Sequence, residues 1–225
     1  MSSPKSIVVL GATGNQGSSV INSYLDQGHS QWRIRGVSRN TSSDKAQALT
    51  KRGVDVVHGD LNDRSSLDAA FAGAHVIFIV SDYLGTFASL AASSSNPNDP
   101  SLYLKAAGTE KQQLTNAFDA AAKLPSLERL VVSSLANPSK WSSGKYTHVY
   151  HFEYKARACE HAAEAYPELW AKTSVFQAGW FLSNYLGGPF APSKPGDDGI
   201  VRFYGNCAQM RSCRSSPARR IQARL

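Results

Sequence analysis

The feature that most constrains this chain is a glycine-rich turn between a short apolar run and a helical pattern. Residues 6–10, Ser-Ile-Val-Val-Leu, form the continuous apolar run expected of a strand buried on both faces. Residues 11–17 follow as Gly-Ala-Thr-Gly-Asn-Gln-Gly, and apolar residues then recur at helical spacing from Val20 to Leu25. Strand, glycine turn and helix in this order predict the first unit of a dinucleotide-binding fold.

The rest of the chain continues this alternation. Further strands are predicted at residues 33–37, 54–58, 75–80, 129–134 and 173–176. Further helices are predicted at residues 43–52, 64–71, 104–123 and 151–166, with an irregular surface loop at 93–100. Six strands alternating with helices predict an α/β fold of the Rossmann type, a doubly wound parallel sheet with helices on both faces. We expect this domain to occupy residues 5–205.

Residues 206–225 have a different character, rich in Arg and Ser, without periodicity and with no acidic residue. Such a segment cannot bury enough apolar surface to offset its ordering entropy, so we expect a disordered basic tail. The six arginines from Arg202 to Arg224 also explain most of the net charge of +7, because 18 basic and 17 acidic residues remain without them. The body is therefore close to neutral, and no direct binding to nucleic acid is expected.

Several classes of protein are disfavoured by simple absences. The sequence has no stretch of about 20 apolar residues and no basic-then-apolar signal peptide, so no membrane span is expected. Cys159, Cys207 and Cys213 lack metal-ligand spacing, and an odd, sparse count is typical of a reducing compartment. His148 and His151 have no evident third ligand, so no metal site is expected. We expect a cytoplasmic protein, with the nucleus as an alternative location.

The glycine turn predicts a pyrophosphate site with a separate role for each glycine. Gly11 permits the tight turn after the strand, Gly14 lets the pyrophosphate approach the backbone, and Gly17 lets the helix pack close to the sheet. The free amides and the dipole of the helix stabilise the phosphate charge. We expect the turn to bind the cofactor through Gly11, Thr13, Gly14, Asn15, Gln16 and Gly17.

The end of the second strand predicts NADP rather than NAD, which remains the alternative. An acidic residue here would hold the ribose 2′-hydroxyl of NAD, but this chain has Ser38 and Arg39, which suit a 2′-phosphate. The alternative for Arg39 is a solvated loop charge. After the third strand, Asp60 is expected to accept a hydrogen bond from the adenine amino group while Leu61 packs on the ring. The alternative for Asp60 is the N-cap of the next helix.

Five segments together resemble the NmrA-like family, whose members are atypical short-chain dehydrogenase/reductases abundant in fungi. They are residues 11–17, 38–41, 59–61, 133–137 and 151–156, and the resemblance extends from about Lys5 to Gly205. It implies NAD(P) binding, a Rossmann domain and a smaller C-terminal substrate lobe. Some family members are transcriptional co-regulators that sense the redox state of the cofactor. Others, near the isoflavone reductase branch, reduce small molecules.

The resemblance also locates a catalytic register, with one departure. Short-chain dehydrogenases use Tyr-x-x-x-Lys, in which the Tyr donates a proton and the Lys holds the nicotinamide ribose, with a Ser at the end of the fifth strand. Here Lys155 is kept, His151 stands at the Tyr position, and Ser133 is the candidate Ser. His151 has a reference pKa that allows it to donate a proton. The alternative is that Lys155 only anchors the ribose and His151 is a polar residue at the helix start.

These observations lead to a main hypothesis and an alternative. The main one is an NADP-binding, redox-sensing regulator with weak or no dehydrogenase activity, whose partner is a transcription factor or another regulatory protein. The alternative is an NADPH-dependent oxidoreductase of a small carbonyl or aromatic metabolite. Family members continue past the point corresponding to Gly205, so we expect the substrate lobe to be incomplete. We interpret the end from Cys207 as a truncated or shifted reading frame, the alternative being a genuine isoform.

Overall fold

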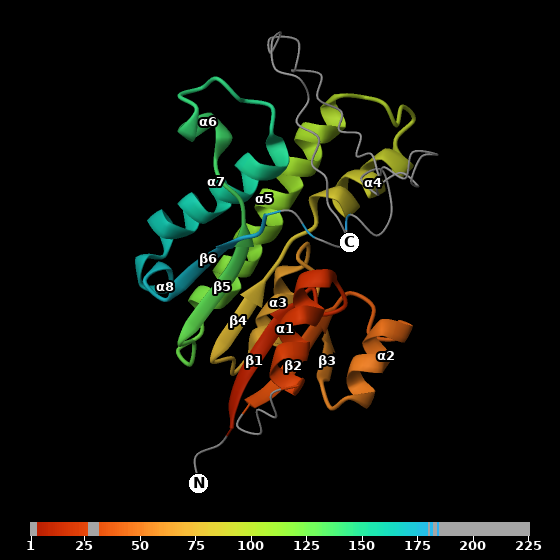
Figure 1. Cartoon of the computed structure of the whole chain (residues 1–225), viewed down its shortest axis with the longest axis vertical. Helices are drawn as coiled ribbons and strands as arrows, with labels where there is room; N and C mark the ends of the chain where they lie inside the picture. Colours follow the sequence, from red (N-terminus) through yellow and green to blue (C-terminus); the bar gives the residue numbers. More distant parts are fainter. Residues whose placement is uncertain (1–3, 27–31, 180, 182–183, 185–225) are drawn as a thin grey trace, which may run out of the picture. The chain divides into compact units, whose positions relative to one another are not determined.

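The computed structural model describes residues 4–26, 32–179, 181 and 184, and every helix and strand named below belongs to one compact unit, residues 1–178 (Figure 1). The predicted tail at 206–225, the domain limit at 205 and the incomplete lobe lie outside the described residues. No helix in the described part is both long and apolar enough to span a membrane.

Six strands form a single parallel sheet in the order β3-β2-β1-β4-β5-β6. The strands are β1 (Lys5–Leu10), β2 (Trp32–Ser38), β3 (Asp55–His58), β4 (Val76–Ile79), β5 (Arg129–Ser134) and β6 (Thr173–Gln177). The order reverses between β1 and β4, which is the topological switch point of a doubly wound sheet. The predicted fold class is therefore confirmed.

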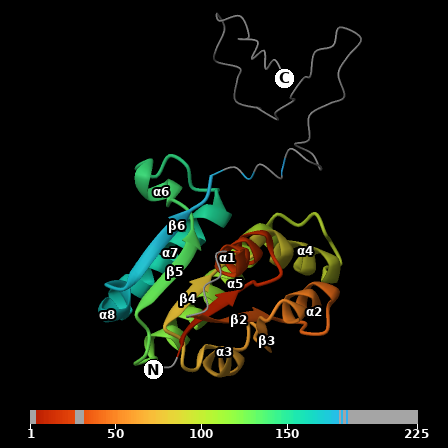
Figure 2. The same cartoon turned by 60° about the horizontal axis from the view of Figure 1, so that its bottom comes forward.

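Eight helices connect or flank these strands in the described residues. They are α1 (Asn15–Asp26), α2 (Asp44–Lys51), α3 (Arg64–Phe71), α4 (Tyr83–Ser93), α5 (Ser101–Ala122), α6 (Pro138–Trp141), α7 (Tyr150–Ala165) and α8 (Pro167–Trp170). Figure 2 shows α7 and α8 beside β5 and β6, at the far end of the sheet from α2 and β3. The sequence did not predict α4, α6 and α8, and α5 begins three residues before its predicted start.

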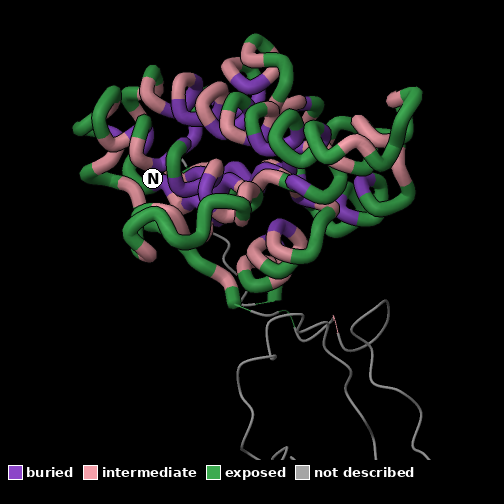
Figure 3. Tube along the Cα trace, turned by 90° about the horizontal axis from the view of Figure 1, so that it is seen from above, coloured by how far each residue is buried: buried purple, intermediate pink, exposed green. Residues whose placement is uncertain are grey.

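The sheet separates two apolar layers. On one face, Ile7, Val9 and Phe78 of the sheet pack with Ile21 of α1 and Leu49 of α2. On the other face, strand residues pack with α3, α5 and α7. This layer contains Val8, Leu10, Ile77, Ile79, Leu130, Val132, Phe71, Phe118 and Ala158. Figure 3 shows buried segments between the layers and exposed segments outside them. This two-sided burial explains the continuous apolar runs of the strands.

Short polar side chains fix where three of the helices begin. Ser43 accepts a hydrogen bond from the amide of Ala46 at the start of α2. Asp63 accepts from the amides of Ser65 and Ser66 at the start of α3. Asp82 caps α4 in the same way. Each cap satisfies a backbone donor that the first turn of a helix leaves unpaired.

The turn between β1 and α1 depends on the absence of a side chain at Gly17. A Cβ added to Gly17 would lie 2.2 Å from the carbonyl oxygen of Gly11 and 2.7 Å from its carbonyl carbon. Both atoms belong to the backbone and cannot move aside. The close approach predicted for Gly17 is therefore confirmed, and it brings the start of α1 against the end of β1.

We expect Gly17→Ala and Gly108→Ala to change stability in opposite directions. Gly17→Ala forces the turn apart and should lower the free energy of unfolding by about 1–3 kcal/mol. Gly108 lies within α5, where an added Cβ meets nothing within 4 Å. Its replacement by Ala should raise the free energy of unfolding by about 1 kcal/mol. Urea denaturation measures both, and an unchanged stability in Gly17→Ala would contradict the packing described here.

Candidate functional site

The glycine turn presents unpaired backbone donors at the carboxyl end of β1. Gly11 has a φ of +68°, which favours glycine, and the amide of Gly14 donates to its carbonyl oxygen over 2.9 Å. The amides of Asn15, Gln16 and Gly17, at the start of α1, have no backbone acceptor among the described residues. The first turn of α1 also contains no acidic residue. This end of the helix therefore suits a phosphate group.

The other turn residues leave the same surface open. Gly14 is exposed, and a Cβ there would meet only the carbonyl oxygen of Gly11, at 3.3 Å. Asn15 is exposed, whereas Thr13 and Gln16 are half-buried. The side-chain oxygen of Gln16 is buried without a hydrogen-bond partner among the described residues. The bare backbone and the unpaired amides fit a negatively charged ligand such as a pyrophosphate.

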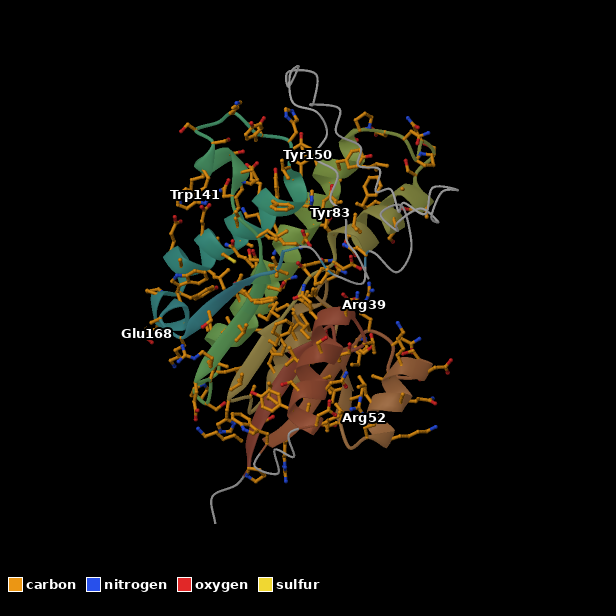
Figure 4. All side chains as sticks on the ribbon, viewed as in Figure 1. Arg39, Arg52, Tyr83, Trp141, Tyr150 and Glu168 are labelled. Atoms are coloured by element: carbon orange, nitrogen blue, oxygen red, sulfur yellow. The ribbon has the colours of Figure 1, made fainter. Side chains whose placement is uncertain are left out.

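At the end of β2, the backbone turn is held without the help of Arg39. Ser38 Oγ donates to the carbonyl of Asn40 over 3.1 Å and accepts from its amide over 3.3 Å. Asn40 in turn accepts from the amide of Ser42 over 2.9 Å. Arg39 is exposed and forms no hydrogen bond or ion pair with any described residue. Its guanidinium is therefore available to an external anion, at the end of the sheet where Figure 4 places it.

After β3, the structure removes one of the two roles considered for Asp60. The N-cap of α3 is Asp63, so the N-cap alternative for Asp60 is wrong. Asp60 Oδ1 instead accepts from the backbone amide and the side-chain amide of Asn62, over 2.9 and 3.0 Å. Leu61 is half-buried against the core on the α3 side. The sequence could not rank two aspartates three residues apart, because either can cap a helix that begins nearby.

Lys155 lies in a buried ion pair that the sequence analysis did not identify. Its ammonium pairs with Glu110 Oε1 of α5 and donates to Ser81 Oγ, after β4, over 2.9 Å. The Glu110 side chain is 0% exposed and that of Lys155 is 11% exposed. Two of the three ammonium hydrogens are thus used within the protein, and one remains for a ligand. Glu110 Oε2 is buried with no partner among the described residues.

His151 lies one helical turn before Lys155 on α7 and is exposed. Its ring centroid lies 5.5 Å from that of Tyr83 and 4.7 Å from that of Phe152, and its nitrogens form no hydrogen bond with a described residue. The protein packed around the ring lowers the pKa of His151 from its ordinary value, and the charge of Lys155 lowers it further. Both effects favour the neutral imidazole.

Tyr83 is a further group that the sequence analysis missed. It is the first residue of α4, is 8% exposed, and its hydroxyl donates to the carbonyl of Tyr103 over 3.0 Å. Burial raises the pKa of Tyr83, and the carboxylate of Glu110 raises it further. Figure 4 shows Tyr83 and Tyr150 beyond the same end of the sheet as Arg39. Tyr83 contributes an aromatic surface beside His151.

Ser133 is not joined to Lys155 or His151. It lies near the end of β5, is 6% exposed, and its hydroxyl forms no hydrogen bond with a described residue. The serine that contacts Lys155 is Ser81, from a different strand end. Within the described residues, no group of three or more His, Cys, Asp or Glu side chains is arranged to hold a metal ion.

A signal for Glu110 was present in the sequence. The predicted helix at 104–123 places Leu114, Ala117 and Ala121 on its inner face, and Glu110 lies four residues before Leu114, on that face. A carboxylate on a buried face needs a cationic partner. The identity of that partner was not readable, because Lys155 is 45 residues away and Ser81 is 74 residues from Lys155.

Solved structures of similar fold include a nicotinamide-binding regulator and a reductase. NmrA, described as a negative transcriptional regulator, aligns with a TM-score of 0.64 in its complex with NADP, at 22% identity, over 89% of this chain and 53% of that one. Triphenylmethane reductase of Citrobacter sp. with NADP(H) aligns with a TM-score of 0.53, at 23% identity, over 80% and 51%. At these identities the likeness establishes the fold.

Sequence comparison finds curated fungal relatives and a family. The NmrA-like family domain-containing oxidoreductase cpsB of Aspergillus campestris is 30% identical over 82% of this chain and 49% of its own length. The corresponding himF protein of Aspergillus japonicus is 31% identical over 80% and 48%. The chain thus spans about half the length of these relatives. The profile of the NmrA-like family matches residues 3–203, and this chain belongs to that family.

Proposed function

We propose that this chain binds NADP at the carboxyl edge of its sheet and serves as a redox-sensing regulator with weak or no dehydrogenase activity. A transcription factor or another regulatory protein would be its partner. The observation that carries the proposal is a contrast within one site. The amides at the start of α1 and the guanidinium of Arg39 have no partner among the described residues, whereas the residue at the proton-donor position is His151, whose pKa is lowered by the protein packed around it.

The cofactor contacts follow from the side chains available at each strand end. The amides of Asn15, Gln16 and Gly17 would bind the pyrophosphate, and the unpaired guanidinium of Arg39 would bind a 2′-phosphate. The third ammonium hydrogen of Lys155 would bind the nicotinamide ribose. NADP or NAD in solved structures of NmrA supports a nicotinamide dinucleotide here, and Arg39 supports NADP.

Proton donation is the catalytic step that the side chains of this site support least. Reduction of a carbonyl needs hydride from the cofactor and a proton from the protein or water. A neutral imidazole carries no readily donated proton, and lowering the pKa of His151 reduces its protonated fraction at neutral pH. Tyr83 has a phenol nearby, but its hydrogen is donated to the carbonyl of Tyr103. The site therefore supports cofactor binding better than proton transfer.

An NADPH-dependent reductase of a small carbonyl or aromatic compound is the second candidate. The curated relatives at about 30% identity are named oxidoreductases, which favours it. The retained Lys155 is also the group that a reductase of this family needs. Activity of a whole relative depends on a polypeptide about twice the length of this match, so this candidate rests on the relatives' names more than on the site.

The regulatory proposal requires the chain to bind the two redox states of the cofactor differently. Calorimetric titration with NADP⁺ and NADPH should give dissociation constants that differ by about threefold or more, which is about 0.7 kcal/mol. Binding of neither nucleotide would contradict both candidate functions. Equal affinity for the two would remove the basis for redox sensing and leave the reductase candidate.

Arg39→Gln should weaken NADP binding selectively. Loss of a charge-assisted contact with the 2′-phosphate should raise the dissociation constant for NADP by about tenfold and leave that for NAD unchanged. Arg52→Gln is the matched control, since Arg52 lies at the opposite end of α2 and contacts Asn22 and Asp26 (Figure 4). An equal loss of affinity for NAD and NADP in Arg39→Gln would contradict the assignment of Arg39.

NADPH oxidation with carbonyl compounds should be slow at pH 7. Any turnover that uses His151 as the acid should increase as the pH falls through the pKa of His151, which burial lowers from its ordinary value, because only the imidazolium can donate. His151→Ala should abolish that increase, whereas His148→Ala, a change at an exposed neighbouring histidine, should preserve it. Rapid turnover at pH 7 that is lost in His151→Ala would overturn the regulatory proposal.

A further inference from the structure

Helix α5 contacts residues at both ends of the proposed cofactor site, the loop after β3 and Lys155 of α7. It packs against α3 and α7 and carries two buried polar side chains, Glu110 and Gln113, on an otherwise apolar face. Buried polar groups on such a face cost free energy unless they are hydrogen-bonded. Their partners therefore indicate why these side chains are placed there.

At one end, Glu110 fixes the side chain that would meet the nicotinamide ribose. A lysine side chain has four rotatable bonds and loses considerable entropy when its ammonium is held in one place. Glu110 Oε1 and Ser81 Oγ together accept two of the Lys155 hydrogens. These two contacts hold the ammonium in place and leave one of its hydrogens without a partner among the described residues.

At the other end, two amides of α5 fix the loop that would meet adenine. Asn116 Nδ2 donates to the carbonyl oxygen of Leu61 over 2.8 Å, and Gln113 Nε2 donates to Asn62 Oδ1 over 3.0 Å. The amide of Asn62 then donates to Asp60 Oδ1 over 3.0 Å. A continuous chain of hydrogen bonds thus runs from Gln113 to the carboxylate of Asp60.

The two sets of contacts lie close together along one rigid helix. Glu110 and Asn116 are six residues apart, which is about 9 Å of helix rise. We propose that α5 positions both ends of NADP, with Glu110 setting Lys155 at the nicotinamide ribose and Gln113 and Asn116 setting Asp60 and Leu61 at the adenine. This inference rests on the proposed function, and all three α5 residues act through other residues rather than by touching the cofactor.

A merely structural role for the same contacts has a different consequence. If Glu110 and Asn116 served only to hold the fold, their replacement would lower stability and would weaken every ligand of the site in proportion. The proposed role instead predicts different effects on binding at the nicotinamide end and at the adenine end of the cofactor. Loss of Glu110 affects only ligands that carry the nicotinamide ribose, whereas loss of Asn116 affects every ligand that carries adenine.

The test compares NADP⁺ with adenosine 2′,5′-bisphosphate, which lacks the nicotinamide nucleotide. Glu110→Gln keeps the shape of the side chain and removes its charge. It should weaken the binding of NADP⁺ about tenfold and leave the binding of the bisphosphate unchanged. Asp119→Asn is the control, because it removes a carboxylate of the same helix that pairs with Arg64 and Tyr166. It should leave the ratio of the two affinities unchanged.

The adenine end is tested with the same two ligands and with nicotinamide mononucleotide, which lacks adenine. Asn116→Ala should weaken the binding of NADP⁺ and of the bisphosphate by a similar factor, about fivefold, through the loss of one hydrogen bond to the loop. It should leave the binding of nicotinamide mononucleotide unchanged, whereas a general loss of structure would weaken all three. Thr115→Ala removes a hydroxyl that bonds only within α5, to the carbonyl of Lys111, and should change none of these affinities. Unchanged affinities in Asn116→Ala would overturn the inference at this end.

The outcomes show separately whether the proposed function fails or only the inference about α5 fails. If the unaltered chain binds neither ligand, the proposed function fails. If the unaltered chain binds both and Glu110→Gln weakens both equally, or neither, the inference fails at the ribose end. If Glu110→Gln does not fold, Ser81→Ala takes its place, because it removes the second acceptor of Lys155 without leaving a buried charge unpaired. Ser81→Ala should weaken the binding of NADP⁺ about threefold and leave the binding of the bisphosphate unchanged. Equal effects on both affinities would overturn the inference.

Discussion

Parallel pairing of all six strands is the constraint on which the candidate site depends. Parallel strands end at the same edge of a sheet, so the segments that follow them gather there although they are far apart in the sequence. The glycine turn follows β1, Arg39 follows β2, Asp60 follows β3 and Ser81 follows β4. Four consecutive strand ends thus contribute one candidate contact each. The close approach of Gly17 to Gly11 completes the arrangement by bringing the start of α1 to the same edge.

The ion pair between Glu110 and Lys155 is better explained by the place in which it holds the Lys155 ammonium than by a contribution to the stability of the fold. Moving two charges out of water costs several kcal/mol per ion, and apolar replacements of a buried pair are often neutral or stabilising. Glu110 is fully buried and one of its oxygens has no partner among the described residues, so part of the cost of burying its charge is not offset. What it contributes is an ammonium held at a fixed place with one hydrogen unused. That property matters only if something binds there.

The sequence predicted regular elements well and long-range contacts poorly, for physical reasons. β5 and α3 have their predicted limits because apolar runs and caps are local signals. α4 was missed because Gly85 and several small residues dilute its helical pattern, although Asp82 caps it. Ser81 and Tyr83, at the junction of β4 and α4, and Glu110, in α5, form the surroundings of Lys155 and His151, which lie far along the chain in α7. Periodicity indicates which face is buried, but it does not identify the partner across the interface.

The charge balance around Lys155 limits how the site could distinguish the two redox states of a bound nicotinamide. Oxidised nicotinamide is positively charged and planar, whereas the reduced ring is neutral and slightly puckered. Lys155 and Glu110 cancel one another, and the lowered pKa of His151 favours the neutral form of its ring. With a local charge close to zero, neither state is strongly rejected by electrostatics. Discrimination must then come from ring shape and packing, for which the aromatic faces of Tyr83 and His151 are available. Because packing differences of this kind are small, a sensor built on this site would respond to large changes in the ratio of the two forms.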